Sequence, residues 1–335
     1  MQKHLRTLTA AVLAAVILTG CGARSAPAES AAFTPSSAAG TASQTSGISF
    51  SDALGRTVEL QSWERVISLY GSFAETWTLA GGALVGVTDD AVEERGLTFD
   101  PGVALVGNVK TPNSEEILAL DPDFVILSAD IEGHLALDEL LTAAGVPHAY
   151  YRVDSFGDYL AMLRQFCDMT GREDLYQKYG ADQQTRIEGI LAAAAKRDGP
   201  RPTVLLLRAY STGVKAKGKD IFAGQLLTEL GAVNIVDQYQ SLLEDLSMEE
   251  IIAADPDYIL VVPMGASEEA AAAYLAEHFE SNPAWAGLSA VQNGNYCFLS
   301  KDLFHYKPNA RWAESYATLA QLLYPGILLP ISALQ

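Results

Sequence analysis

The sequence predicts an α/β fold of two Rossmann-like lobes, each with a parallel-sheet core, joined by one long helix. Two observations support this. Short apolar runs alternate with helical segments along the chain, as in parallel sheets covered by helices. In addition, residues 113–126 (NSEEILALDPDFVI) recur as residues 247–260 (SMEEIIAADPDYIL). A repeat that covers a helix start, a turn and a strand indicates two similar lobes.

We place the first ligand-binding lobe at residues 48–171 and the second at residues 198–335. The apolar run at 204–207 is continuous, as expected for a parallel strand buried on both faces. Strands are predicted at residues 66–69, 84–87, 124–127, 204–207 and 258–262. Helices are predicted at residues 72–80, 115–119, 222–230 and 310–323.

Residues 172–197 are predicted to form the helix that links the lobes. Its apolar face recurs at helical spacing, and Gly199 with Pro200 ends it. Gly189 weakens the pattern, so two shorter helices with a break there are the alternative. We favour the single helix, which would restrict hinge motion between the lobes.

The N-terminus has the pattern of a signal peptide, residues 1–20. A short basic segment precedes an apolar stretch that is too short to span a bilayer. The stretch ends at Leu-Thr-Gly-Cys, which resembles a bacterial lipoprotein cleavage box, so we expect Cys21 to carry the lipid. An ordinary secretory peptide is the alternative. Residues 21–47 are rich in small and polar residues and read as a flexible tether. The protein is therefore expected to be extracytoplasmic and lipid-anchored to the cell membrane.

Composition narrows the possible functions. The net charge of −19 argues against a nucleic-acid partner. The chain contains no nucleophile elbow, no zinc-protease motif and no phosphate or dinucleotide loop, so we expect no enzyme. Cys167 and Cys297 could form a disulfide in an oxidising compartment, but we favour two buried free thiols.

Each repeat begins with a helix-capping pattern. Asn113 and Ser247 are expected N-caps, and the glutamates three residues later, Glu116 and Glu250, are expected to complete capping boxes. The preceding glutamates, Glu115 and Glu249, should then project to solvent, one from each lobe. They could dock a two-subunit partner, or they could simply complement the helix dipoles.

Ligands of α/β lobes bind beyond the carboxyl ends of the strands. In the first lobe these positions hold Tyr70, Ser72, Phe73 and Lys110. In the second lobe they hold Arg208, Tyr210, Lys301, Phe304 and His305. The cations of the second lobe would suit an anionic chelate, and the aromatic side chains could stack on it. Alternatively, these are solvated loop residues, the run 215–219 is an exposed hairpin, and His305 is structural rather than an axial haem ligand.

Four segments in order resemble the bacterial binding proteins for siderophores, haem and cobalamin. They are residues 65–90, 107–127, 247–262 (SMEEIIAADPDYILVV) and 308–325 (PNARWAESYATLAQLLYP). The resemblance implies a substrate-binding protein of an ABC importer that works with a permease dimer and its ATPase. It also implies that Glu115 and Glu249 dock on permease arginines.

The expected ligand is a small metal chelate, a ferric siderophore in preference to haem or cobalamin. We expect no resident cofactor and no metal bound directly by side chains, because no cluster of Tyr, His and carboxylates is evident. The protein should be a monomer that contacts the membrane only through its lipid. A membrane-anchored sensor that does not transport its ligand would share all these features.

Overall fold

The computed structural model describes residues 47–265 and 267–329. The expected signal peptide, the lipidation residue Cys21 and all but the last residue of the expected tether lie outside the described residues. Within the described ranges, no helix has the length and apolar character needed to cross a membrane.

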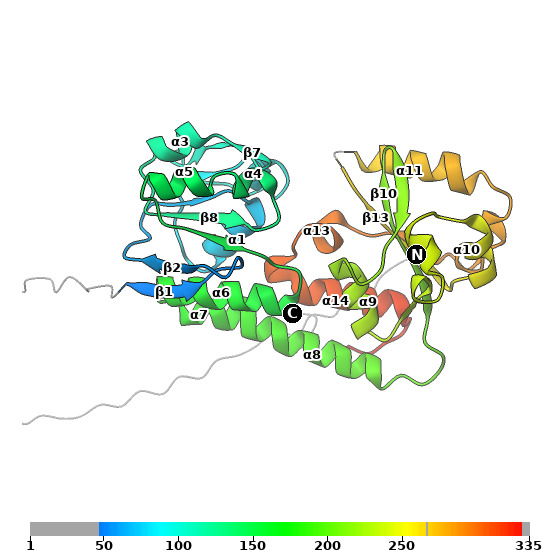
Figure 1. Ribbon diagram of the computed structural model, residues 1–335. Helices are drawn as coiled ribbons and strands as arrows, with labels where there is room; N and C mark the ends of the chain where they lie inside the picture. The colour runs from blue at the N-terminus through cyan, green and yellow to red at the C-terminus, as the bar shows by residue number, and fades with distance from the viewer. Residues whose placement is uncertain (1–46, 266, 330–335) are drawn as a thin grey trace, which may run out of the picture. The chain divides into compact units, whose positions relative to one another are not determined.

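The first lobe, coloured blue to green in Figure 1, contains a five-stranded parallel sheet in the order β5-β4-β3-β8-β9. Its strands are β3 (Val66–Ser68), β4 (Gly86–Val87), β5 (Ala104–Leu105), β8 (Phe124–Ser128) and β9 (His148–Tyr151). Every residue of β8 is buried, so both faces of the sheet are covered. The covering helices include α1 (Gly71–Leu79), α3 (Ser114–Ala119), α5 (Asp138–Ala143) and α6 (Phe156–Thr170).

Shorter elements complete this lobe. Two antiparallel pairs lie outside the main sheet, β1 (Ile48–Ser51) with β2 (Thr57–Leu60) and β6 (Gly107–Asn108) with β7 (Thr111–Pro112). Two single-turn helices are α2 (Asp90–Glu93) and α4 (Glu132–Leu135). The β6–β7 hairpin carries Lys110 at its turn, beside the main sheet's carboxyl edge.

The second lobe contains a mixed sheet. The strands β10 (Thr203–Tyr210), β12 (Val233–Asn234), β13 (Tyr258–Pro263) and β14 (Tyr296–Phe298) are parallel. β11 (Gly213–Ala216) folds back antiparallel on β10. The lysine-rich run predicted as a possible exposed hairpin therefore begins in this hairpin. The helices are α9 (Phe222–Glu229), α10 (Met248–Ala254), α11 (Glu268–Leu275), α12 (Ser289–Gln292), α13 (Lys301–Phe304) and α14 (Trp312–Leu323).

The repeated Asp-Pro-Asp turns have the same conformation and make equivalent hydrogen bonds in both lobes. Asp121 and Asp255 have φ angles of 46° and 37°, a left-handed conformation that ends α3 and α10. The carboxylate of Asp123 accepts the backbone N–H of Arg65 over 2.9 Å. In the second lobe the Asp257 carboxylate accepts the N–H of Thr203 over 2.8 Å. Each turn thus ties the start of one central strand to the start of its neighbour.

In both sheets the strand order reverses at the first strand, because later strands are added on its opposite side. The chain adds β4 and β5 on one side of β3 and then β8 and β9 on the other. In the second lobe β13 and β14 lie on the opposite side of β10 from β11 and β12. Such reversal points leave a crevice at the carboxyl ends of the two central strands, where ligands of α/β sheets bind.

The linking segment is helical from Glu173 to Ala195, as α7 (Glu173–Tyr176), a π-helical turn (Gln177–Ala181) and α8 (Asp182–Ala195). The helix is continuous through Gly189, where the alternative reading placed a break. The irregular turn instead surrounds Gly180, where an added Cβ would lie 3.2 Å from Leu160 and Leu163 of α6. Close packing on α6 therefore accounts for the small residue there.

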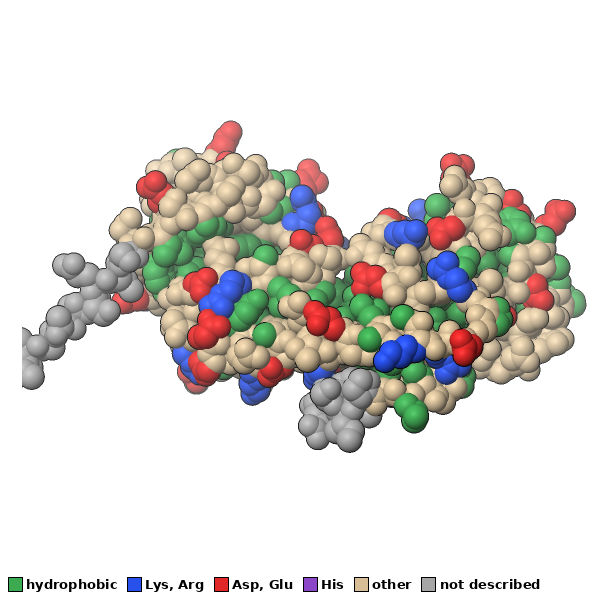
Figure 2. All heavy atoms as spheres, turned by 90° about the horizontal axis from the view of Figure 1, so that it is seen from below, with side chains coloured by type: hydrophobic (Ala, Val, Ile, Leu, Met, Phe, Trp, Pro, Cys, Tyr) green, Lys and Arg blue, Asp and Glu red, His purple; other side chains and the backbone are tan. Residues whose placement is uncertain are grey.

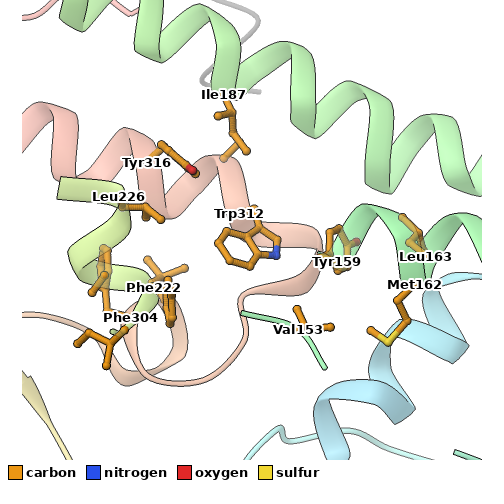
Figure 3. Close-up of a cluster of buried hydrophobic side chains, with 14 of the residues drawn as sticks. Val153, Tyr159, Met162, Leu163, Ile187, Phe222, Leu226, Phe304, Trp312 and Tyr316 are labelled. Carbon is orange, nitrogen blue, oxygen red and sulfur yellow. The ribbon is translucent and has the colours of Figure 1, made fainter. Parts of the chain in front are cut away.

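One hydrophobic cluster contains side chains from both lobes and from α8. Trp312 lies at its centre (Figure 3), edge-on to Phe156 with ring centroids 5.8 Å apart and to Phe222 at 5.5 Å. Phe156 begins α6 of the first lobe, and Phe222 begins α9 of the second. The two lobes are thus joined by a shared core as well as by a helix.

The cysteines of the two lobes are free thiols. Cys167 is buried in the shared core, and burial raises its pKa to about 11. Cys297 is only half-buried, so the expectation of two buried thiols holds for Cys167 alone.

Candidate functional site

Tyr70 follows β3 and immediately precedes α1 at the carboxyl edge of the first sheet. Its ring packs edge-on against Phe73, with ring centroids 4.9 Å apart. Burial, and then the nearby Asp90, raise the pKa of the Tyr70 hydroxyl to about 12. The hydroxyl therefore remains protonated and can donate a hydrogen bond at any physiological pH.

Two predicted ligand residues of the first lobe face the protein interior. Ser72 is 3% exposed, and its hydroxyl lies 3.3 Å from the Asn309 side-chain oxygen. Phe73 is 1% exposed and belongs to the shared core. The first turn of α1 rotates both side chains away from the strand ends. Ser72 and Phe73 are therefore not part of the candidate site.

Asp90 holds the start of α1 beside Tyr70. Its carboxylate accepts the backbone N–H of Gly71 over 2.7 Å and the hydroxyl of Thr88 over 2.6 Å. Burial raises its pKa, and the two hydrogen bonds lower it. Gly71 is required here because an added Cβ would lie 2.7 Å from the Ala91 backbone.

Lys110 is exposed at the turn of the β6–β7 hairpin. His134, which sequence reasoning missed, fixes this hairpin to the sheet. Its Nδ1 accepts the N–H of Ser128, the last residue of β8, over 2.9 Å. Its Nε2 lies 2.8 Å from the carbonyl of Val109 and donates to it. Burial lowers the pKa of His134 to about 4, so the imidazole is neutral.

In the second lobe, Arg208 and His305 each bury a side-chain nitrogen that has no hydrogen-bond partner among the described residues. The Arg208 side chain projects from β10, and its Nε is buried and unpartnered. Nδ1 of His305, at the end of α13, is in the same situation. Burial, and then the charges of Arg208, Lys301 and Lys307, lower the pKa of His305 to about 4.

Lys301 lies near both lobes. Its Nζ donates to the Gly265 carbonyl over 2.6 Å and lies 5.4 Å from the centroid of the Tyr306 ring. Its charge also reaches the first lobe. Partial desolvation raises the pKa of Glu94, and Lys301 and Lys110 lower it. Lys301, Glu94 and Lys110 are therefore electrostatic neighbours, although they come from different lobes.

The remaining predicted residues of the second lobe differ in their exposure and partners. Tyr210 is half-buried at the carboxyl end of β10, as a pocket wall would require. Phe304 is 1% exposed and packs in the shared core, so it too is left out of the site. Lys217, in the loop after β11, forms an ion pair with Asp220 over 2.6 Å.

The two lobes present opposite charges near the strand ends. The first lobe contributes mainly acids, of which Asp130 pairs with Arg152 over 2.7 Å. The second contributes Arg208, Lys301 and Lys307. By contrast, on the face seen from below, basic and acidic side chains are interspersed (Figure 2). Among the residues that the structure describes, no group of three or more His, Cys, Asp or Glu side chains could hold a metal ion.

Glu115 and Glu249 are exposed in the first turns of α3 and α10. The Asn113 side chain caps α3 by accepting the N–H groups of Glu115 and Glu116, over 3.1 and 3.4 Å. The predicted return bond from Glu116 is wrong, because the Asn113 N–H donates instead to the Val106 carbonyl over 2.8 Å.

The same correction applies to the second lobe. Ser247 caps α10 through the N–H of Glu250 over 3.4 Å. The Glu250 carboxylate accepts the Ser241 hydroxyl at 2.7 and 2.8 Å rather than the N–H of its own cap. Glu115 and Glu249 remain the exposed glutamates at equivalent positions of the repeat.

Residues 66–303 match the family model described as periplasmic binding protein. The chain belongs to the periplasmic binding protein family. Members of this family are extracytoplasmic substrate-binding proteins that work with the permease and ATPase of ABC importers. The family membership and the α/β fold predicted from the sequence are both confirmed.

Two relatives and one solved structure illustrate the family membership. The Fe(3+)-citrate-binding protein YfmC of Bacillus subtilis (strain 168) is 24% identical over 257 residues, 75% of this chain and 78% of that protein. The high-affinity heme uptake system protein IsdE of Staphylococcus aureus (strain MRSA252) is 22% identical, over 65% of this chain and 74% of its own length. The structure of the TroA-like periplasmic binding protein FepB from Veillonella parvula has a TM-score of 0.64 at 20% identity, covering 86% of this chain and 94% of that one.

Proposed function

We propose that this periplasmic binding protein captures an anionic iron chelate and delivers it to an ABC importer. A ferric siderophore is the preferred ligand, with haem or cobalamin as the alternatives. The proposal rests mainly on a cluster of the second lobe near the carboxyl edge of the sheet, which consists of two cations, Arg208 and Lys301, and the neutral imidazole of His305. The names of two relatives, one for ferric citrate and one for haem, agree with this class of ligand.

The chemistry of the cluster suits carboxylate or catecholate oxygens. A guanidinium offers several donors in a planar fork, which pairs with two oxygens of an anionic group. Arg208 and His305 each have a buried nitrogen without a hydrogen-bond partner in the described protein, and buried polar groups in folded proteins are normally paired. A ligand oxygen would satisfy both. Tyr70 and Tyr210 supply aromatic walls, and Lys110 adds a further cation from the first lobe.

Delivery would depend on the two exposed glutamates. Glu115 and Glu249 occupy equivalent positions in the two repeats, so a two-subunit permease could bind one with each subunit. The lipid expected on Cys21 and the tether to residue 47 would hold the protein near the permease. In this view the protein contacts the membrane only through the lipid and acts as a monomer.

The proposal is tested by titrating the purified protein with ferric citrate, a ferric catecholate, a ferric hydroxamate, haem and cobalamin, followed by tryptophan fluorescence with inner-filter correction. We expect saturable quenching by one chelate at micromolar concentration or below. Arg208→Ala and Lys301→Ala should weaken that binding at least tenfold. Lys196→Ala, which removes an exposed cation beyond the end of α8, is the matched control and should change nothing. Absence of saturable binding by all five would refute the proposal.

A further inference from the structure

The surroundings of His305 determine how an anion would affect it. α13 follows β14, which pairs with β13, and β13 pairs in turn with β10, the strand that carries Arg208. β13 (Tyr258–Pro263) contributes no charged side chain. The Tyr306 ring lies 4.9 Å from the imidazole, centroid to centroid. His305 is therefore enclosed by an apolar sheet, an aromatic ring and cations.

The charges that act on His305 come from three cations, whereas Asp302 of the same helix acts on Arg311. Arg208 comes from β10, Lys301 from α13 itself, and Lys307 from the segment after it. Lys307 also pairs with Asp154 of the first lobe over 3.5 Å. α14 packs against α13, and near its start the charges of Arg311 and Glu314 pair with each other over 2.7 Å. No carboxylate is therefore the partner of His305 among these groups.

We infer that Arg208 and His305 together form an oxyanion subsite, and that His305 takes up one proton when a carboxylate or catecholate group of the ligand binds there. The inference deepens the proposed function and rests on it. In the ligand-free protein the neutral imidazole minimises repulsion with the three neighbouring cations. A bound anion makes the local potential less positive, so the imidazole can accept a proton from solvent at its unprotonated ring nitrogen and bind the oxyanion as a cation.

The direction of the pH effect follows from this linkage. The pKa of His305 is about 4 in the ligand-free protein, and a bound anion raises it. Affinity therefore increases as the pH falls through the window between the two pKa values, by up to about tenfold per pH unit for one proton. Release of the ligand is favoured at higher pH, where the imidazole returns its proton to solvent.

The test measures the dissociation constant of the whole protein for ferric citrate at pH 5.5, 6.5 and 7.5, or for the tightest-binding of the other chelates if ferric citrate does not bind. His305→Gln retains a hydrogen-bond donor but cannot titrate in this range. The ratio of the two proteins' affinities cancels changes in the chelate itself. We expect the ratio of wild-type to His305→Gln affinity to increase at least tenfold from pH 7.5 to 5.5. His278→Gln, at an exposed histidine on a different helix, should give a constant ratio.

A wild-type to His305→Gln ratio that stays constant within threefold, with binding intact, would overturn the proton-linked subsite and leave the proposed function standing. Arg208→Gln provides an independent check. It should weaken binding at every pH, because the fixed positive charge is lost, and equal affinity to wild type would also overturn the subsite. If no chelate binds the wild-type protein at any pH, the proposed function fails and the subsite with it.

Discussion

Asn309 donates a hydrogen bond from its side-chain amide to the carboxylate of Glu75 over 2.8 Å, joining the second lobe to helix α1 of the first. The same amide donates to the carbonyl of Ser72 over 3.0 Å. Asn309 is fully buried and has a φ of 50°, in the left-handed region. The Glu75 carboxylate also accepts a hydrogen bond from Nε of Arg95 over 2.9 Å. This network fixes α1, whose first turn follows Tyr70, against the second lobe.

Asn309→Ala is expected to lower the free energy of unfolding by about 2–4 kcal/mol, because it removes buried hydrogen bonds and retains the strained backbone. Asn309→Gly removes the same bonds but relaxes the backbone, so it should be about 1 kcal/mol less destabilising than Asn309→Ala. Denaturant unfolding of both variants measures the difference. Equal destabilisation would show that the left-handed φ carries no cost.

His134 should make the protein less stable in acid. Its pKa is about 4 in the folded protein, against 6.5 ordinarily, so the unfolded chain binds more protons between these values. Stability is then complete above about pH 6.5 and falls toward pH 4, by about 3 kcal/mol at 1.36 kcal/mol per pKa unit. Denaturant unfolding at pH 7 and 4.5 measures the loss. His134→Gln should show a shallower dependence on pH, whatever its stability at pH 7, and an unchanged slope would contradict the assignment.

Charge reversal at both exposed glutamates should separate transport from binding. Glu115→Lys with Glu249→Lys is expected to abolish chelate uptake by cells that depend on this protein while leaving the dissociation constant unchanged. The control is Glu139→Lys with Glu268→Lys, which changes net charge equally at exposed positions on α5 and α11. Uptake at the wild-type rate in the first double variant would argue for a sensor or a different docking surface.

Trp312→Ala should destabilise the protein by about 3–5 kcal/mol, as expected for removing a fully buried large aromatic side chain. The other side chains of the shared cluster still come from both lobes, so thermal unfolding of the variant should remain a single transition at lower temperature. Two separate transitions in calorimetry of the variant, with one in the wild type, would show instead that Trp312 alone couples the lobes. Trp312→Phe, which keeps an aromatic ring, should cost less.

The fold could be predicted because its signals are local. The Asp-Pro-Asp turn, the caps Asn113 and Ser247 and the apolar runs each report on a few neighbouring residues. The same locality explains the errors. Glu116 and Glu250 have suitable spacing for capping boxes, but in the structure Val106 and Ser241 compete for the bonds those boxes need.

The site was less predictable because a strand end fixes an approximate position but not the direction of a side chain. Lys301 and His305 were predicted from their place after a strand, and Arg208 was predicted to follow the strand that the structure extends to Tyr210. Ser72 was placed in the pocket, yet its hydroxyl is turned toward Asn309, 237 residues away. The roles of His134 and Asn309 depend on partners far away in the sequence, and no local sequence pattern predicts those roles.

The hydrophobic cluster that the two lobes share has a consequence for the lifetime of the protein outside the cytoplasm. A protease acts on segments that open, and neither lobe can expose its half of the Trp312 cluster while the other stays closed. Cleavage then depends on opening of the whole body, which a bound chelate suppresses in proportion to its occupancy of the folded state. Loaded molecules would therefore outlast empty ones, and the extracytoplasmic pool would be enriched in protein that carries its ligand.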